Sequence, residues 1–116
     1  MEKIISEINN FLEKQAWCDF NIIEFNGKLK VGGKTSFNNE YDIIIVFEEI
    51  FYFQCLFSWQ TDTSYKSFLI PEIEEQRDIN IKYGIEQGYS LFKIIPEDIE
   101  GSMYISAKNI YIEYMR

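Results

Sequence analysis

The longest hydrophobic run in the chain extends from Tyr41 to Trp59, and its β-branched and aromatic residues suit the pleated surface of a sheet. Its length would also allow a membrane-spanning helix. Glu48 and Glu49 lie at its centre, however, where carboxylates are costly in a bilayer, and no basic cluster flanks either end. The run therefore predicts two consecutive buried strands, Asp42–Phe47 and Ile50–Trp59, broken or bulged at the two glutamates.

The beginning of the chain shows a helical period instead. Between residues 2 and 16 the apolar side chains recur three or four positions apart, at Ile4, Ile5, Ile8, Phe11 and Leu12. This spacing predicts an amphipathic helix whose apolar stripe packs on the protein's own sheet. Glu2 near its start and Lys14 near its end agree with the helix dipole.

A β-hairpin is predicted around Asn26-Gly27, which separates the stretches Phe20–Phe25 and Lys28–Val31. Asn-Gly is typical of a type I′ turn, in which both central residues have φ > 0. A two-residue turn predicts these pairs across the hairpin: Phe25 with Lys28, Glu24 with Leu29, and Ile22 with Val31.

The second half of the chain predicts further strands separated by polar turns. They are Ser67–Ile70, halted by Pro71, then Ile79–Ile85, Tyr89–Ile95 and Met103–Tyr114. The last of these changes phase at Lys108-Asn109, which indicates a tight hairpin or a bulge. Two acidic segments lie between these strands: Glu72–Asp78, either a helical turn or an exposed loop, and the loop Pro96–Gly101.

Together these elements predict an α+β protein that forms one domain over residues 1–116. The N-terminal helix is expected to cover one face of a mostly antiparallel sheet of about eight strands. We expect that sheet either to curl into a half-barrel or to form a small sandwich.

The residue types present restrict the chemistry. The chain has no histidine, which excludes Ser-His-Asp and Cys-His catalytic arrangements and imidazole metal sites. Cys18 and Cys55 have no basic neighbours in sequence and no C-x-x-C spacing, so we interpret them as packing residues in a reducing compartment. Paired carboxylates remain available, but acidic pairs in loops are usually solvated charge. With no signal or transit peptide visible, we expect a cytoplasmic protein without catalytic activity, cofactor or metal.

Charge is distributed unevenly along the chain. The net charge is −8. Five lysines balance five acidic residues up to Asn39, whereas fourteen acidic residues face only six basic ones from Glu40 onward. A basic footprint for nucleic acid is therefore missing. An acidic field attracts a basic protein partner, although solubility alone would also explain it.

Candidate partner-binding residues are the acidic runs and one tryptophan that ends a hydrophobic strand beside a polar turn. They are Trp59, Asp62, Glu72, Glu74, Glu75, Asp78, Glu97, Asp98 and Glu100. An aromatic anchor with a charged rim is typical of protein interfaces. The alternative for Trp59 is that it packs at the end of the core.

A small, acidic, aromatic-rich chain without catalytic equipment resembles the bacterial immunity proteins, and phage inhibitors of host defence nucleases, that neutralise basic, often nuclease-like effectors. Size, charge and the missing catalytic groups carry this resemblance, and no motif does. It implies that acidic side chains occupy the effector surface meant for a phosphate backbone. Two alternatives remain: a structural subunit or homodimer that uses an exposed sheet edge, or a small-ligand pocket lined by Phe47, Phe51, Phe53, Phe57 and Tyr104.

Overall fold

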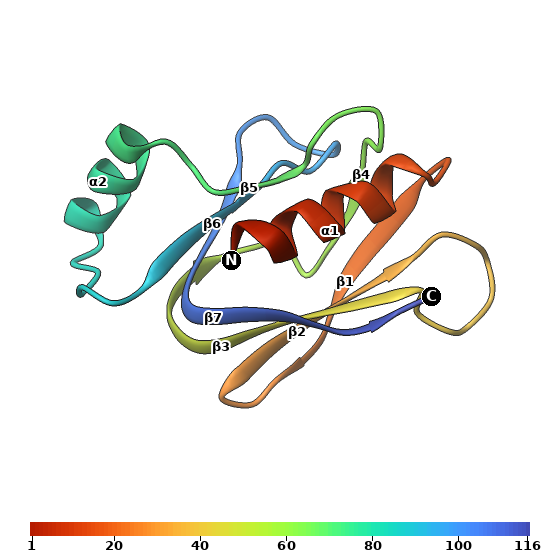
Figure 1. The fold of residues 1–116 in the computed structure, drawn as a ribbon, viewed down its shortest axis with the longest axis horizontal. Helices are drawn as coiled ribbons and strands as arrows, with labels where there is room; N and C mark the ends of the chain where they lie inside the picture. The colour runs from red at the N-terminus through yellow and green to blue at the C-terminus, as the bar shows by residue number, and fades with distance from the viewer.

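The computed structural model describes all 116 residues, as a curled antiparallel sheet covered on its concave face by the N-terminal helix (Figure 1). The seven strands lie in the order β4-β1-β2-β3-β7-β6-β5, and every neighbouring pair is antiparallel. The elements are α1 (Glu2–Glu13), β1 (Cys18–Phe25), β2 (Lys28–Lys34), β3 (Ile43–Gln54), β4 (Ser58–Thr61), β5 (Phe68–Leu69), α2 (Ile73–Lys82), β6 (Ser90–Ile94) and β7 (Met103–Met115). The predicted helix on a curled antiparallel sheet is confirmed, with seven strands in place of about eight.

The apolar stripe of α1 packs on the sheet, as its spacing predicts. Ile5, Ile8, Phe11 and Leu12 are buried, and Ile4 is half-buried at the edge of the same core. Removing such side chains from water stabilises the fold by roughly 1.5–3 kcal/mol each. Neither helix has the length and apolar character needed to cross a bilayer.

Phenylalanines from several strands fill the space beneath α1. Phe20, Phe47, Phe68 and Phe92 are essentially inaccessible to water. The ring centroids of Phe20 and Phe68 are 5.4 Å apart, and those of Phe47 and Phe92 are 5.5 Å apart. Phe20 lies on β1, the strand next to the β4 end of the sheet, and Phe68 lies on β5 at the other end, so the first contact joins strands far apart in the sheet order. The sheet is therefore curled strongly enough for its two ends to share one core.

Both edge strands are covered by hydrogen bonds from elsewhere in the chain. At β5, the buried Asn9 of α1 donates its side-chain amide to the carbonyl of Phe68 (2.8 Å) and accepts from the Phe68 N–H (3.2 Å). At β4, the N–H of Gln60 donates to Asp98 Oδ1 (2.6 Å), and its carbonyl accepts from the Glu97 N–H (2.9 Å). Paired edges resist strand addition, so these two positions do not provide the open edge expected for self-association.

The sheet bends where β3 and β7 change direction together. Glu49 is the only non-glycine residue with positive φ, at 54°, and the pairing with β7 is irregular just beyond it. Lys108 on β7 reaches Glu49 across the bend, with Nζ 3.8 Å from Oε1. The break or bulge predicted at the glutamates is therefore not found there: β3 is one strand that bends at Glu49, and its bulge lies just beyond, between Ile50 and Tyr52. Lys108-Asn109 is the matching bend inside β7, not a hairpin turn.

The prediction of a single strand from Ile50 to Trp59 is wrong. β3 ends at Gln54, and β4 begins at Ser58 after a short link. That link lets the chain cross from the partner strand β7 to the far edge beside β1. Tertiary pairing, not hydrophobicity, therefore divides the predicted strand Ile50–Trp59.

The predicted β1–β2 hairpin is present, but its turn type and final register are wrong. Gly27 has φ 74°, whereas Asn26 does not have positive φ, so the turn is not type I′. The pair Ile22–Val31 forms as predicted, but a bulge at Ile23 shifts the pairs beyond it. As a result Phe25 faces Leu29, and of the two only Leu29 is buried, while Phe25 is 57% exposed.

The predicted strand Ile79–Ile85 is also wrong, because residues up to Lys82 belong to helix α2. The preceding acidic run, read as a helical turn or a loop, begins this helix. Its end is a Schellman motif at Gly84 (φ 61°): the Ile85 N–H donates to the Asn80 carbonyl (2.9 Å). The alternation of apolar residues predicted a strand with one buried face. Ile81, one of these residues, is instead 74% exposed, so the alternation does not correspond to a buried face.

Helix α2 stands at one end of the molecule and has no buried residue (Figure 1). Polar and aromatic contacts attach it to the sheet. Glu75 binds Lys93 Nζ (2.9 Å to Oε2) and accepts a hydrogen bond from Tyr104, and the rings of Tyr83 and Tyr52 stack at 4.2 Å. Burial opposes ionisation of Glu75, but the Tyr104 and Lys93 hydrogen bonds outweigh it and lower the pKa of this carboxyl.

We predict that Gly27→Val lowers the free energy of unfolding by more than about 1 kcal/mol, because a β-branched residue resists positive φ. No atom lies within 4 Å of a Cβ built at Gly27, so the loss would come from backbone strain and not from a clash. Urea unfolding measures the change. Gly27→Asn is the control and should cost much less, since asparagine tolerates this region; a valine variant as stable as the parent would contradict the prediction.

Candidate functional site

Trp59, proposed from the sequence as an aromatic anchor, lies in the core. Its side chain is 2% exposed, and its ring stacks on Phe20 with centroids 5.5 Å apart. The alternative reading, in which it packs at the end of the core, is the arrangement found. Trp59 therefore cannot present its indole face to a partner in this conformation.

The two acidic runs lie in different places. Glu72 precedes α2, and Glu74 and Asp78 lie on it, all three exposed; Glu75 is occupied by Lys93 and Tyr104. The run Glu97–Glu100 belongs instead to the connection between β6 and β7, which reaches the edge of β4. The structure thus separates the predicted surface into an α2 part and a β4 part.

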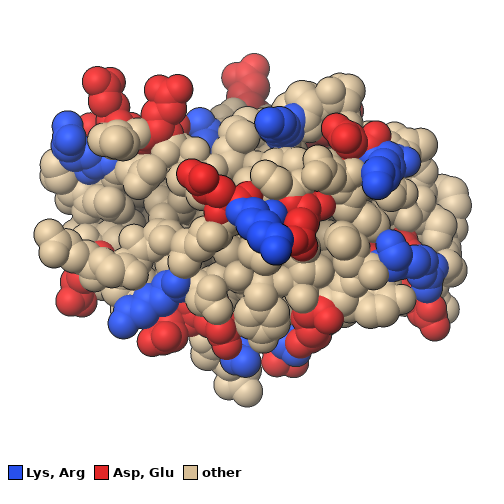
Figure 2. Space-filling view, in the orientation of Figure 1, with Lys and Arg blue, Asp and Glu red and all other residues tan.

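Acidic side chains do not form a continuous surface on the face seen in Figure 2. Lysine and arginine side chains alternate there with aspartate and glutamate. Six acidic residues take part in ion pairs: Glu40, Asp42, Glu48, Glu49, Glu75 and Glu113. Local groups of carboxylates outside ion pairs therefore indicate a binding surface better than the net charge does.

One such group surrounds a hollow of about 360 Å³ beside the β4 edge. Its walls come from segments far apart in the chain: the residue before β1, β1 itself, the β2–β3 connection, β4 and the loop after β6. The lining residues are Trp17, Asp19, Phe37, Gln60, Thr61 and Glu97. Two further hollows of about 220 and 210 Å³ also contain Asp19, so together they form what we call the Asp19 groove.

An aromatic pair forms one wall of the Asp19 groove. The rings of Trp17 and Phe37 have centroids 5.3 Å apart and are tilted by 43°. Phe37 is 96% exposed, more than any other large hydrophobic residue of the protein. Phe37 is not among the residues predicted from the sequence because its segment, Lys34–Glu40, is otherwise polar; a lone aromatic residue there was the available signal.

Carboxylates also line the groove. Asp19, Glu97 and Asp98 take part in no ion pair. Burial and the negative charge of Asp98 raise the pKa of Asp19. Lys34, the one cation lining the adjoining hollow, has its Nζ 5.1 Å from the centroid of the Tyr41 ring. The groove therefore combines carboxylates outside ion pairs with an aromatic pair of which Phe37 is exposed, which is the chemistry that binds organic cations.

Of the other predicted residues, Asp98 and Glu97 belong to the groove, and Glu100 is exposed further along the same loop. Asp62 follows β4 and accepts hydrogen bonds from the Ser64 hydroxyl (2.6 Å) and N–H (2.9 Å). Those bonds lower the pKa of Asp62. Asp62 thus stabilises a turn and does not line the groove.

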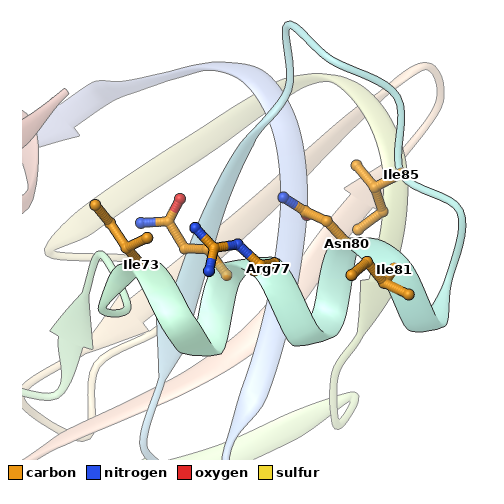
Figure 3. A pocket seen from close by; sticks show the side chains of 6 residues that line it. Ile73, Arg77, Asn80, Ile81 and Ile85 are labelled. Atoms are coloured by element: carbon orange, nitrogen blue, oxygen red, sulfur yellow. The ribbon is translucent and has the colours of Figure 1, made fainter.

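A second hollow, of about 340 Å³, lies along α2 (Figure 3). It is lined by Ile73, Gln76, Arg77, Asn80, Ile81 and Ile85. All six belong to the helix and the turn that follows it, so no other element supplies a facing wall. It is a weaker candidate than the Asp19 groove, where five segments meet.

The five aromatic residues predicted to line a ligand pocket do not line a common cavity, and each has a different environment. Phe47 contacts Phe92, Phe51 contacts Tyr89, Phe53 contacts Phe25, Tyr104 binds Glu75, and Phe57 is 71% exposed. They do not converge on the Asp19 groove or the α2 hollow. No group of three or more His, Cys, Asp or Glu side chains is arranged to hold a metal ion.

Both cysteines are free thiols. Burial raises the pKa of Cys18 to about 12, with the negative charges of Asp19 and Asp42 acting in the same direction. Burial alone raises the pKa of Cys55 to about 12. Since the thiolate is the reactive form, we predict that both label slowly near neutral pH until the protein unfolds. Rapid modification by a thiol reagent in native buffer, followed by mass spectrometry, would contradict this.

Asp98→Asn should bring the pKa of Asp19 down toward its ordinary range, because the substitution removes a neighbouring negative charge. Asparagine keeps the Oδ1 that accepts the Gln60 N–H, so the β4 edge remains paired. Carboxyl ¹³C chemical shifts followed against pH measure the change. An unaltered Asp19 pKa would mean that burial alone perturbs it.

The raised pKa of Asp19 also determines how its ionisation affects the stability of the fold. Because the pKa of Asp19 is raised in the folded protein, its ionised form opposes folding above that pKa, and the opposition disappears as pH falls through it. Asp19→Asn should therefore be at least as stable as the parent at neutral pH, with any advantage lost in acid. Chemical unfolding at several pH values tests this.

Comparison with known proteins finds no matching family model, no similar curated protein and no similar solved structure.

Proposed function

We propose that this chain is a non-catalytic binding protein that inhibits a basic, nuclease-like effector, in the manner of bacterial immunity proteins or phage inhibitors of host defence nucleases. The Asp19 groove is the observation that carries the proposal. It places Asp19, Glu97 and Asp98, none of them in an ion pair, beside the half-buried ring of Trp17 and the exposed ring of Phe37.

This arrangement suits recognition of a positively charged protein surface. Aromatic anchors supply contact area, and desolvated charge pairs supply specificity. The carboxylates would take the positions that the effector offers to phosphates, and the net charge of −8 would accelerate the encounter. The free thiols of Cys18 and Cys55 fit a reducing compartment such as the cytoplasm.

Backbone hydrogen bonds hold the β4 side of the groove in place. Asp19 and Gln60 are paired across β1 and β4, and both backbone groups of Gln60 are bound by the 97–98 segment. A preformed site loses little conformational entropy on binding. By contrast, the acidic residues around α2 belong to an element without buried residues, and we assign them to long-range attraction only.

Photo-crosslinking in the source cells identifies the partner. A benzoylphenylalanine at Phe37 should capture a basic protein, and the same group at the exposed Phe57 serves as the control. The captured protein is then purified, and its activity is measured with increasing inhibitor. Stoichiometric loss of activity supports the proposal; an acidic partner, or one whose activity is unchanged, refutes it.

A matched pair of charge variants distinguishes carboxylates that contact the partner directly from those that only attract it at long range. Asp19→Asn/Glu97→Gln/Asp98→Asn removes three charges from the groove, and Glu72→Gln/Glu74→Gln/Asp78→Asn removes three around α2. Glu75 is left unchanged because it anchors α2 to Lys93 and Tyr104.

The groove variant should weaken binding to the captured partner by more than about tenfold even at high salt, because close charge pairs are lost. The α2 variant should slow association by only about threefold, and only at low salt. Surface plasmon resonance at several salt concentrations measures both. Equal effects of the two variants would place the contact surface elsewhere.

A further inference from the structure

We infer that the Asp19 groove binds one arginine side chain that the basic partner presents on an extended segment. This inference rests on the proposed function and names the chemical group that the site recognises. Its supporting observations are the size of the hollow, the composition of its walls and the hydrogen bonds already made at the β4 edge.

The hollow suits a single long side chain. Its volume of about 360 Å³ lies near the lower end of the range of small-molecule sites, roughly 300–1,000 Å³. A helix or a folded loop would not enter it. The adjoining hollows, which share Asp19, extend the groove on both sides and leave room for the chain that carries the side chain.

The walls favour a guanidinium over an ammonium group. A guanidinium is planar, stacks on aromatic faces and donates hydrogen bonds in several directions, whereas an ammonium is a compact and strongly hydrated charge. Trp17 and Phe37 supply the faces, and the carboxylates of Asp19 and Glu97 supply charged acceptors.

The partner segment is expected to bind through this side chain and not by adding a strand. At Gln60 both outward-facing backbone groups of β4 are already bound by Asp98 and Glu97. Main-chain pairing at this edge would have to displace them, which leaves side-chain recognition as the available mode.

Short synthetic peptides test the inference without the natural partner. The probes are Gly-Gly-Arg-Gly-Gly with blocked ends, the same peptide with lysine or with citrulline in place of arginine, and free L-arginine. Citrulline matches arginine in shape but carries no charge. Amide and indole ¹H–¹⁵N spectra of the ¹⁵N-labelled protein follow each titration at low salt.

The arginine peptide should shift the signals of Trp17, Asp19 and Phe37 in a saturable manner. The citrulline peptide should bind at least about tenfold more weakly, and the lysine peptide several-fold more weakly. Trp17→Ala and Asp19→Asn should each reduce the shifts, and Phe57→Ala, which removes an exposed ring outside the groove, should not. Circular dichroism confirms that each variant is folded.

Several outcomes overturn the inference. Equal binding of lysine and arginine peptides would remove the guanidinium preference, and a lack of saturable shifts with the arginine peptide would remove the pocket. Shifts confined to α2 would move the site, and free arginine binding as well as the peptide would indicate a small-molecule ligand. None of these results decides whether the captured partner is inhibited, so a failure here and a failure of the proposed function can be told apart.

Discussion

The curled sheet depends on hydrogen bonds that close its two edges. A sheet with a covered concave face must end somewhere, and an unpaired edge strand would expose backbone groups beside the core. Asn9, buried within α1, supplies both a donor and an acceptor to Phe68 on β5. At the other edge the 97–98 segment does the same for Gln60 on β4. With both edges satisfied, Phe20 and Phe68 can meet in one core beneath the helix.

Closing the β4 edge also builds the candidate site. The loop after β6 must approach Gln60 to bind its backbone, and this approach brings Glu97 and Asp98 close to Asp19 on β1. Burial, together with the negative charge of Asp98, raises the pKa of Asp19. No cation of the protein forms an ion pair with these three carboxylates, although six other acidic residues have such partners. The contact that closes the β4 edge therefore also gathers three carboxylates that have no ion-pair partner within the protein.

Much of the architecture was predictable because its signals are local. The helical spacing of Ile5, Ile8 and Leu12 and the alternation within the strands require only neighbouring residues. The two phase changes, at Glu48-Glu49 and at Lys108-Asn109, were also visible, and they prove to be the two sides of one bend. The acidic loop at Glu97 and Asp98 was recognised as a candidate for the same reason: its charges are adjacent in sequence.

The sequence was thus sufficient to predict the class of fold, the covering helix and two of the three groove carboxylates, Glu97 and Asp98. It was not sufficient to predict that Trp59 is buried, that residues 79–82 extend a helix, or that Trp17 and Phe37 form a pair. The physical reason is that burial and aromatic contact depend on which strands become neighbours. Trp59 points into the core because β4 pairs with β1, and Phe37 meets Trp17 because the β2–β3 connection folds back over the start of β1.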